Sequence, residues 1–292
     1  NGARLMKTSD FFYDLPPERI AQTPIEPRDA SRLLVCNRGD GQRAHRVFRD
    51  LPDYLRPGDA LVLNHTRTIP ARLIGRRDGS GGAVELLLLK RLTSHAWEAL
   101  VRPGKKLLPG AVCVFGEGLL RAHIEARTSA EGGRRIRFSY EGVFEELLDR
   151  LGTMPLPPYI HEKLENPARY NTVYAKIDGS AATPTAGLHF TPELLARIRA
   201  KGASVVPILL HVGLGTFRPV KAKDVEGHVM HAEYYEVSEE AAAALNAARA
   251  RGGRIVCVGT TAVRTLETVT GEDRVIRPGA GFTSIFITPG TP

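Results

Sequence analysis

Two histidines and a glutamate stand close together in the most polar segment of the chain, residues 228–235. His228 and His231 are three residues apart and Glu233 follows, so these three side chains could ligate a metal ion. The alternation of His231, Glu233 and Tyr235 instead indicates one face of a strand, which His228 need not share. We therefore expect a polar site without a metal. A structural hydrogen-bond network is the alternative.

A glycine turn supplies the next candidates. His211 follows a predicted buried strand and leads into Gly213 and Gly215. The third glycine of a dinucleotide fingerprint would fall at Arg218, and Pro219 follows in place of a helix, so that interpretation fails. What remains is a tight turn at which backbone amides can approach a ligand, or a purely structural turn.

Residues 184–191 lead directly into a predicted helix. Their small side chains would let a ligand lie close to the backbone, and the helix N-terminus favours an anionic group such as a carboxylate. His189 could act there as an acid or base. Packing or capping of the helix is the alternative for this histidine.

Residues 259–267 form a predicted strand-to-helix turn. Sheets of the α/β class bind ligands at the carboxyl ends of their strands. Arg264 could therefore bind a phosphate or carboxylate, with Glu267 as its helical ion-pair partner.

The composition is that of a soluble globular protein with a sizeable core. Of 292 residues, 42% are hydrophobic and 25% are charged, and no apolar run approaches the roughly 20 residues that span a bilayer. Residues 1–5 precede Met6 and lack the apolar stretch of a signal peptide. The three cysteines form no Cys-x-x-Cys pair, which predicts a reducing, cytoplasmic compartment. The formal net charge of +8 suits a polyanionic partner.

Strands and helices alternate in the first and last parts of the chain, which favours an α/β layer. The predicted strands there are residues 60–64, 204–210, 254–259 and 283–288. The predicted helices are residues 192–201 and 238–251, with Thr191 and Ser238 as N-caps.

Between these parts, short apolar or alternating runs are separated by glycine turns, which is typical of a small antiparallel barrel or sandwich. The predicted strands are residues 71–74, 83–89, 97–101, 111–115, 119–125 and 134–138, and a helix follows at residues 143–151. We predict an α/β main domain, residues 1–65 and 154–292, interrupted by an inserted small antiparallel β-barrel domain, residues 66–153.

The predicted barrel is rich in basic residues: Arg67, Arg72, Arg76, Arg77, Lys90, Arg91, Arg102, Lys105 and Lys106. Trp97 lies among them in sequence. A basic surface that carries an aromatic side chain suits RNA, because unpaired bases stack on aromatic rings. A solvated face without a partner is the alternative.

Taken together, these segments resemble one family, the S-adenosylmethionine:tRNA ribosyltransferase-isomerases of queuosine biosynthesis. The resemblance covers almost the whole chain and is carried by residues 13–16, 21–24, 28–34, 66–73, 154–160, 169–175, 185–191, 211–217, 230–235, 259–267 and 286–290. The chain departs from the family pattern at Ala232 and Ala262, where serine is expected, at Thr183, where alanine is expected, and at His65, where Asn or Asp is expected. The family pattern also leads us to expect a Thr-Asn-Phe-His-Leu-Pro segment after Pro292.

The resemblance implies a metal-free reaction in which S-adenosylmethionine is the co-substrate and donates its ribosyl group. The acceptor would be 7-aminomethyl-7-deazaguanine at the wobble position of a tRNA with a GUN-type anticodon. The products would be epoxyqueuosine in the tRNA, adenine and methionine. We further expect a monomer with no tightly bound cofactor, no metal and no membrane partner.

Site residues follow from this reaction and from the polar segments at predicted strand ends. We hypothesise that His189 or Glu233 is the base and that His211 or His231 assists the departure of adenine. The expected substrate-binding residues are Arg67, Thr185, Gly187, Gly213, Gly215, Thr216, Tyr234 and Arg264. The expected tRNA-binding residues are Arg76, Arg77, Arg102, Lys105 and Lys106.

Two other functions stay open from the sequence. One is a metal-dependent hydrolase of nucleic acid that uses His228, His231 and Glu233, and the other is a non-catalytic tRNA-binding protein. An ordinary methyltransferase is disfavoured, because the glycine signature of the usual α/β fold for that cofactor is absent.

Overall fold

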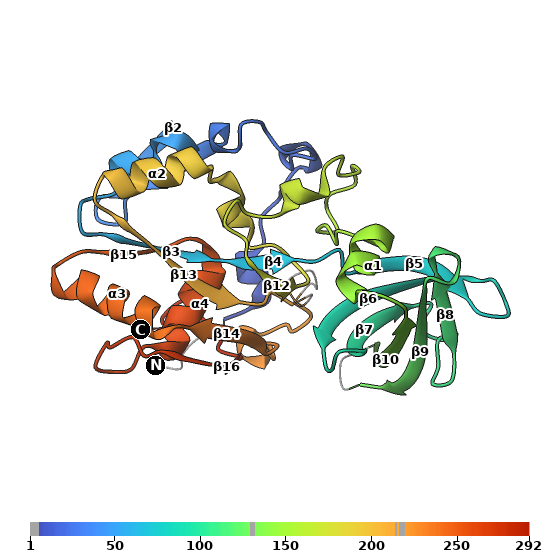
Figure 1. Ribbon diagram of the computed structural model, residues 1–292. Helices are drawn as coiled ribbons and strands as arrows, with labels where there is room; N and C mark the ends of the chain where they lie inside the picture. Colours follow the sequence, from blue (N-terminus) through green and yellow to red (C-terminus); the bar gives the residue numbers. More distant parts are fainter. Residues whose placement is uncertain (1–5, 129–131, 214, 216–219, 292) are drawn as a thin grey trace.

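A computed structural model describes residues 6–128, 132–213, 215 and 220–291. A small antiparallel barrel stands beside a five-stranded mixed sheet that is flanked by helices (Figure 1). The strand order in the mixed sheet is β15 (Ile255–Cys257), β3 (Ala60–Asn64), β13 (Ser204–Leu210), β14 (Glu233–Val237) and β16 (Gly279–Thr283). The first three strands are parallel, and β14 and β16 run antiparallel to their neighbours.

The central strand β3 is buried along its whole length because both faces of the sheet are covered. Ala60 and Val62 pack on α3 (Glu239–Ala250) and α4 (Gly259–Val269). Leu61 and Leu63 point to the other face and pack on α2 (Pro192–Ala200) and on the 3-10 helix η4 (Phe48–Tyr54). Alternate residues of one strand therefore belong to two hydrophobic cores.

Two predicted helix caps are confirmed. The Thr191 hydroxyl accepts a hydrogen bond from the amide of Leu194 at the start of α2. The Ser238 hydroxyl accepts one from Ala241 at the start of α3. Both bonds satisfy backbone donors that the first helical turn leaves without an intrahelical partner.

The second part of the structure is a closed barrel of six antiparallel strands. They are β5 (Arg72–Arg77), β6 (Ala83–Arg91), β7 (Ala96–Arg102), β10 (Gly133–Tyr140), β9 (Leu120–Arg127) and β8 (Val112–Phe115) in order around the barrel. Pairing of β5 with β8 closes it, and β11 (Gly152–Thr153) extends β5 on its other side. Each predicted strand of residues 71–138 is present. The barrel residues lie between β3 and β13 in the sequence.

Helix α1 (Phe144–Leu151) contributes to the barrel core, because its buried residues Phe144 and Leu148 belong to the same hydrophobic cluster as the barrel strands. The ring of Phe144 contacts those of Trp97 and Phe138, with centroids 5.8 and 5.1 Å away. Trp97 is consequently only 5% exposed. The expectation that this tryptophan offers a surface for stacking RNA bases is therefore wrong, since its ring is used by the core.

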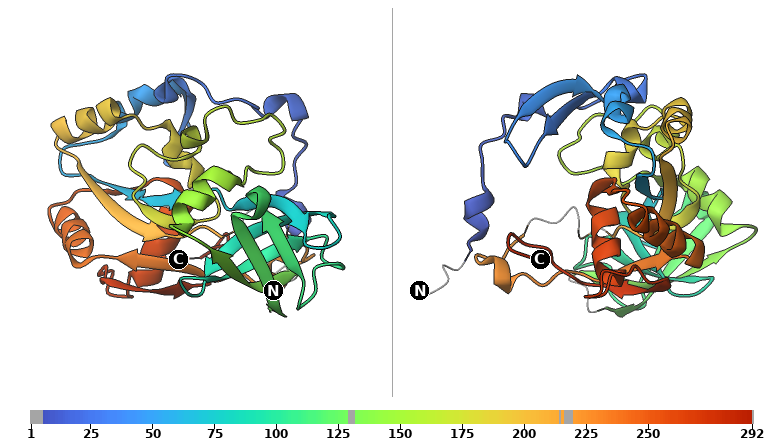
Figure 2. Two further views of the ribbon diagram at one scale, coloured as in Figure 1. Left: turned by 45° about the vertical axis from the view of Figure 1, so that its right-hand side comes forward. Right: turned by 90° about the vertical axis from the view of Figure 1, so that its left-hand side faces the viewer.

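The N-terminal segment arches away from the rest of the molecule and returns to it (Figure 2). It begins at η1 (Thr8–Phe11), where the amide of Thr8 donates to the carbonyl of Lys223 at 2.9 Å. It ends in the hairpin of β1 (Arg32–Cys36) and β2 (Arg43–Val47). Further short 3-10 helices are η2 (Pro17–Arg19), η3 (Arg28–Ala30), η5 (Gly116–Gly118), η6 (Pro167–Tyr170), η7 (Thr185–His189) and η9 (Val225–Gly227).

A short parallel pair links the two parts of the structure. β4 (Thr66–Thr68) follows β3 and pairs with β12 (Ile177–Ser180). Neither strand was expected, because each is too short to show a hydrophobic period.

One predicted strand is misplaced. Residues 283–288 were expected to be extended and paired, but β16 ends at Thr283. In the antiparallel register with β14, Thr283 lies opposite Glu233, which is the first residue of β14. No partner strand among the described residues continues beyond that point, so the sheet ladder stops there.

Candidate functional site

Two cavities lie where the barrel meets the mixed sheet. The larger has a volume of about 510 Å³ and the smaller about 400 Å³. The walls of both include Ile69, Glu145, Leu148 and Asp178, so the two cavities are neighbours across these side chains. Such a site between two parts of a fold is a common place for a small ligand.

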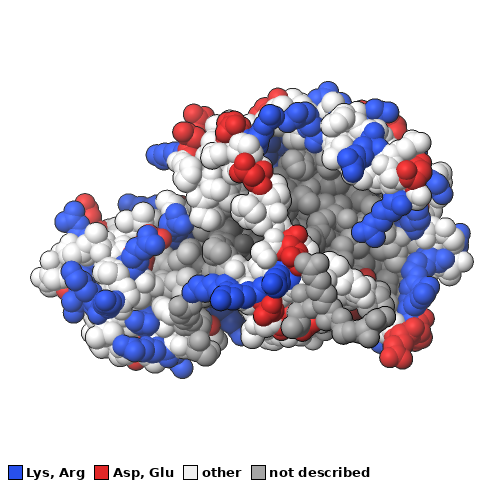
Figure 3. All heavy atoms as spheres, turned by 180° about the vertical axis from the view of Figure 1, so that it is seen from behind, with Lys and Arg blue, Asp and Glu red and all other residues white. Residues whose placement is uncertain are grey.

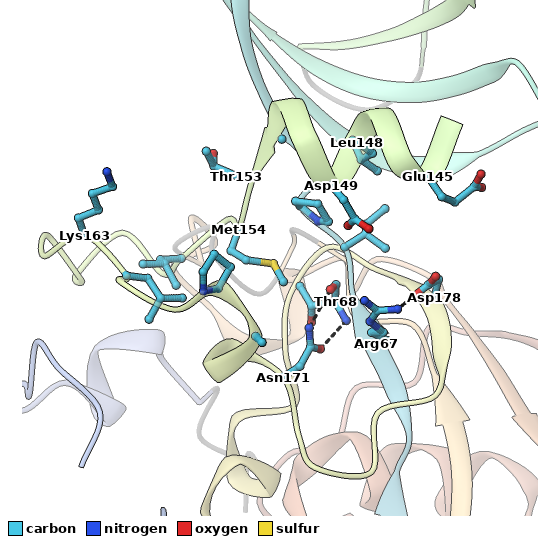
Figure 4. A pocket seen from close by; sticks show the side chains of 17 residues that line it. Arg67, Thr68, Glu145, Leu148, Asp149, Thr153, Met154, Lys163, Asn171 and Asp178 are labelled. Atoms are coloured by element: carbon cyan, nitrogen blue, oxygen red, sulfur yellow. Dashed lines mark hydrogen bonds and ion pairs between the residues drawn. The ribbon is translucent and has the colours of Figure 1, made fainter. Parts of the chain in front are cut away.

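The larger cavity contains groups of both charges (Figure 4). Arg67 and Asp178 point toward each other there, with 3.6 Å between Nη1 and Oδ1. Glu145 and Asp149 project from α1. The buried amide of Asn171 exchanges two hydrogen bonds with the backbone of Thr68, which fixes the wall of the cavity beside β4.

The smaller cavity is lined from both sides. The barrel side supplies Leu89, Lys90, Arg91, Trp97 and Phe144. The sheet side supplies Gly179, His211, Val212, Gly213, Ala232, Glu233, Tyr234 and Phe282. Two predicted catalytic residues, His211 and Glu233, therefore line one cavity at the ends of β13 and β14, and His231 lies beside Glu233.

A buried ion pair lies behind this cavity. Nη1 of Arg264 on α4 donates to Oε2 of Glu233 at 2.5 Å, and the two residues are 8% and 6% exposed. Nη2 of Arg264 donates to the carbonyls of His231 and Thr283. The partner predicted for Arg264 was Glu267, so that expectation is wrong. Arg264 binds a carboxylate, but it is that of Glu233.

Glu233 is held in place by more than this pair. Its Oε1 accepts a hydrogen bond from the amide of Gly213 at 2.8 Å and lies 3.4 Å from Nε2 of His231. Gly215 lies against the His231 ring, because a Cβ atom on this glycine would meet ring atoms at 2.1 to 2.4 Å. The second glycine of the predicted turn thus makes room for a histidine. Thr216, a predicted substrate-binding residue, lies outside the described residues.

Contacts between the ends of the neighbouring strands β3 and β13 position His211. Asn64, at the end of β3, exchanges two hydrogen bonds with the backbone of Leu210 at the end of β13. The next residue, His211, bonds Oγ1 of Thr66 through Nδ1 at 2.9 Å. Gly179, whose φ of +145° favours glycine, leaves space for the ring, since a Cβ atom there would meet it at 2.7 Å.

Aromatic rings line the wall of the cavity next to His211. The Tyr234 ring stacks on that of His211, with centroids 5.8 Å apart, and meets Phe282 edge-on at 5.6 Å. Lys90 of the barrel places Nζ 4.4 Å from the centre of the Phe282 ring, a cation–π contact between barrel and sheet. Burial and the carboxylate of Glu236 raise the pKa of Tyr234, so its hydroxyl remains protonated.

The segment with His189 lies elsewhere. His189 lines neither cavity; its Nδ1 bonds the Ser31 hydroxyl at 3.0 Å, and its ring packs on Phe48. Gly187 is required for packing, because a Cβ atom there would lie 2.0 Å from the hydroxyl oxygen of Tyr174. Thr185 is exposed on η7. The structure thus separates this segment from the cluster of His211, His231 and Glu233.

Metal-ligand geometry was the other interpretation of residues 228–235. The His228 ring packs edge-on against the ring of Phe286, with 5.1 Å between the centroids. Across residues 6–128, 132–213, 215 and 220–291, no group of three or more His, Cys, Asp or Glu side chains could hold a metal ion.

The predicted tRNA-binding residues lie at the end of the barrel away from the cavities. Arg76 pairs with Ala83 at the start of β6, and Arg102 pairs with Glu85. Lys90 lies at the other end of β6, roughly 20–25 Å along the strand. Arg76, Arg102, Lys105 and Lys106 are exposed, whereas Arg77 is half-buried. Basic side chains extend over both the barrel and the sheet part and border a hollow (Figure 3).

Three partly buried histidines make stability depend on pH. Burial is the main cause that lowers the pKa of His65, His189 and His211 from the ordinary value of 6.5. The folded protein keeps these rings neutral where the unfolded chain already binds protons. The contribution of these neutral histidines to the free energy of unfolding is therefore fully present above about pH 6.5, and it is lost as the pH falls below that value.

We predict that the free energy of unfolding, measured in urea between about pH 7.5 and pH 5, decreases by up to about 1.4 kcal/mol per pH unit for each histidine. His189→Gln should reduce this slope by up to one such contribution, because glutamine does not titrate. An unchanged slope in that variant would show that His189 is not held neutral.

Asp178, Gly179 and Ser180 are residues of this site that the sequence did not single out, and Thr66 entered only as part of the segment 66–73 that resembles the family. Threonine, serine and glycine are common in loops, and no spacing joins residues 66 and 180. Only the position of Thr66 shortly after the buried strand of residues 60–64 could have pointed to this group.

Comparison with known proteins identifies the family. Residues 8–292 match the family model described as "Queuosine biosynthesis protein". The S-adenosylmethionine:tRNA ribosyltransferase-isomerase of Symbiobacterium thermophilum is 64% identical over 285 residues, 98% of this chain and 83% of that protein. The protein of the same name from Pelotomaculum thermopropionicum is 58% identical over the same shares of the two chains.

A solved structure is also similar in sequence. The crystal structure of S-adenosylmethionine tRNA ribosyltransferase from Thermotoga maritima is 37% identical, covers 97% of this chain and 81% of that chain, and has a TM-score of 0.48. No helix among the described residues is long and apolar enough to cross a membrane. By the match of its residues 8–292 and by its identities of 64% and 58% to the two ribosyltransferase-isomerases, the chain belongs to the queuosine biosynthesis protein family.

Proposed function

We propose that this chain transfers and isomerises the ribosyl moiety of S-adenosylmethionine onto 7-aminomethyl-7-deazaguanine at the wobble position of a tRNA. The products are epoxyqueuosine in the tRNA, adenine and methionine. The family membership and the names of the relatives support this reaction. The observation that carries it in the structure is the smaller cavity, where His211, Glu233 and Tyr234 meet basic and aromatic barrel residues.

The chemistry needs a base and a way to release adenine. The sulfonium of S-adenosylmethionine acidifies the neighbouring ribose carbon, so a positioned base can remove a proton there and open the sugar. Adenine leaves as the sugar opens. The aminomethyl nitrogen then forms a bond to a carbon of the opened sugar and loses a proton. An oxygen of the opened sugar finally displaces methionine from the carbon that carried the sulfonium, and the epoxide closes. We assign the base to Glu233 with His231 beside it, because their side chains are 3.4 Å apart. We place His211 at the departing adenine.

The linings of the two cavities support this proposal, because each suits one end of S-adenosylmethionine. The aromatic wall of Tyr234 and Phe282 suits a purine ring. Arg67 and Asp178 in the larger cavity suit the carboxylate and ammonium of the methionine end. Gly213 and Gly215 shape the turn that holds Glu233 and His231. Arg264 acts on the substrate only through Glu233, which it positions.

Residues 66–153 form, in this proposal, a separate domain that is inserted into an α/β domain of residues 1–65 and 154–292. The closed set of barrel strand pairings supports this division. The protein would act as a cytoplasmic monomer on a tRNA with a GUN-type anticodon. The three free cysteines are consistent with a reducing compartment.

Release of adenine tests the reaction directly. The full chain is incubated with S-adenosylmethionine, with and without tRNA that carries the deazaguanine precursor. We expect adenine and methionine to appear in equal amounts and only with that tRNA. A methylated product, or phosphodiester cleavage that a chelator stops, would support a methyltransferase or a metal-dependent hydrolase instead. Binding of tRNA without adenine release would support a non-catalytic tRNA-binding protein.

A second prediction concerns the barrel surface. We propose that Arg76, Arg77, Arg102, Lys105 and Lys106 bind phosphates of the tRNA, which the exposure of Lys105 and Lys106 allows. Lys105→Glu with Lys106→Glu should weaken tRNA binding and reduce the slope of log K against log salt by about 0.7–0.9 for each phosphate that the variant no longer neutralises. Arg38→Glu with Arg43→Glu, at two exposed residues of the hairpin of β1 and β2, serves as a control for the same change in net charge elsewhere on the molecule. Unchanged affinity in the lysine variant would remove this surface from the proposal.

A further inference from the structure

A chain of buried hydroxyl groups lies behind His211. Nδ1 of His211 is 2.9 Å from Oγ1 of Thr66, and Oγ1 of Thr66 is 2.8 Å from Oγ of Ser180. Oγ of Ser180 accepts a hydrogen bond from the amide of Val212, also at 2.8 Å. Thr66 and Ser180 are both 0% exposed, so water does not compete for these groups. The described residues offer the two hydroxyls no other partner.

The donor and acceptor in each of these hydrogen bonds follow from the need of both hydroxyl protons for an acceptor. Each hydroxyl carries one proton, and a buried donor without an acceptor is unfavourable. If Ser180 donates to Thr66 and Thr66 donates to Nδ1 of His211, both protons have acceptors. If Nδ1 instead donates to Thr66 and Thr66 donates to Ser180, the proton of Ser180 has no acceptor. If both neighbours donate to Thr66, the proton of Thr66 has none.

We infer that Thr66 and Ser180 are positioning residues that hold His211 as the neutral tautomer with its proton on Nε2. His211 then offers the smaller cavity a hydrogen-bond donor and no free lone pair. Among the described residues, none bonds Nε2, so this donor is available to a ligand. One tautomer of a histidine is fixed by the bond that its other nitrogen makes.

The surroundings of the ring indicate what this donor would bind. Tyr234 stacks on the His211 ring, and Phe282 stands beside Tyr234. A planar heteroaromatic ring could lie against these side chains and accept a hydrogen bond from Nε2 of His211 through a ring nitrogen lone pair. This step rests on the proposed function, in which the ligand is the adenine ring of S-adenosylmethionine, whose ring nitrogens are acceptors.

The inference also narrows the roles of the other residues. A neutral imidazole that already carries a proton on Nε2, and whose Nδ1 accepts from Thr66, cannot take the ribose proton. His211 would stabilise charge on the departing adenine by hydrogen bonding, without transferring its proton. Removal of the ribose proton then falls to the pair of Glu233 and His231.

The tautomer can be measured without turnover. The full chain is labelled with ¹⁵N-histidine, and the couplings of ring protons to ring nitrogens are recorded at neutral pH, with His211→Gln to assign the signals. We expect the form protonated on Nε2 to exceed the other neutral form at least about tenfold, as one unsatisfied buried donor implies. A wild-type His211 protonated on Nδ1, or on both nitrogens, would overturn the inference.

Three variants test the positioning. Thr66→Val removes the hydroxyl and should give a mixture of the two tautomers, whereas Thr66→Ser should restore the wild-type form. Thr68→Val is the matched control on the same strand, because its hydroxyl bonds Thr183 and not a histidine. With S-adenosylhomocysteine as the probe, Thr66→Val should weaken binding about tenfold and Thr66→Ser less than about threefold. Equal tautomer ratios in wild type and Thr66→Val would contradict the inference.

The two proposals fail in different ways. Adenine release by a protein whose His211 is protonated on Nδ1 would refute the positioning role and leave the reaction intact. A protein whose His211 carries its proton on Nε2 but releases no adenine would refute the reaction and leave the tautomer assignment intact.

Discussion

Replacing Arg264 by methionine is expected to lower the free energy of unfolding by about 3–5 kcal/mol, because Glu233 would remain buried without its cationic partner. Both side chains are almost fully buried, so water cannot take the place of the guanidinium. The carbonyls of His231 and Thr283 would lose a donor as well. Urea unfolding at neutral pH measures the change.

A double-mutant cycle isolates the pair. Combining Arg264→Met with Glu233→Gln removes both charges, and this double variant should be more stable than Arg264→Met alone. Arg277→Met is the matched control, because Arg277 forms an exposed ion pair with Asp273 on the surface. That variant should unfold almost like the wild type. A loss of stability at Arg264 no larger than that at Arg277 would show that the buried pair does not stabilise the fold.

The second large effect is expected on turnover. Replacing His211 by phenylalanine should lower kcat for adenine release by about 10²–10³-fold, the effect of removing one positioned hydrogen-bond donor from a developing charge. Phenylalanine keeps a ring that can stack on Tyr234. Circular dichroism and urea unfolding establish that the variant is folded before its rate is compared.

His189→Phe is the corresponding control. His189 was also expected to be catalytic, but it lines neither cavity and bonds Ser31. Its replacement should leave adenine release within a few-fold of the wild-type rate. If this variant lost as much activity as His211→Phe, the reaction would have to be placed near η7 and not in the smaller cavity.

Elements with a strong local period could be predicted from sequence. The alternation of apolar and polar residues in 134–138 and the apolar run of residues 60–63 each identify a strand, and Thr191 identifies a helix start. Trp97 shows where this reasoning was incomplete. It alternates with Ala99, which faces the barrel core. Alternate residues of a strand share a face, so Trp97 should also face the barrel core. The basic residues near it in the sequence had instead suggested an exposed position.

The contacts of the site could be predicted only in part. His211, Glu233 and Tyr234 stand at strand ends, which the sequence indicated. Their partners depend on the register of distant strands. The bond from His211 to Thr66 spans 145 residues, and the partner of Arg264 lies 31 residues away and not on the next helical turn. No local spacing encodes such pairings, so the sequence favoured Glu267.

The place of β3 has a consequence for synthesis of the chain on the ribosome. Each barrel strand pairs with partners inside residues 72–153, so the barrel can close soon after those residues emerge. β3 is made earlier, yet its neighbours β13 and β15 come only at residues 204–210 and 255–257. A nascent chain therefore carries a folded barrel and an unpaired apolar strand at the same time, and that strand is where chaperones or aggregation would act.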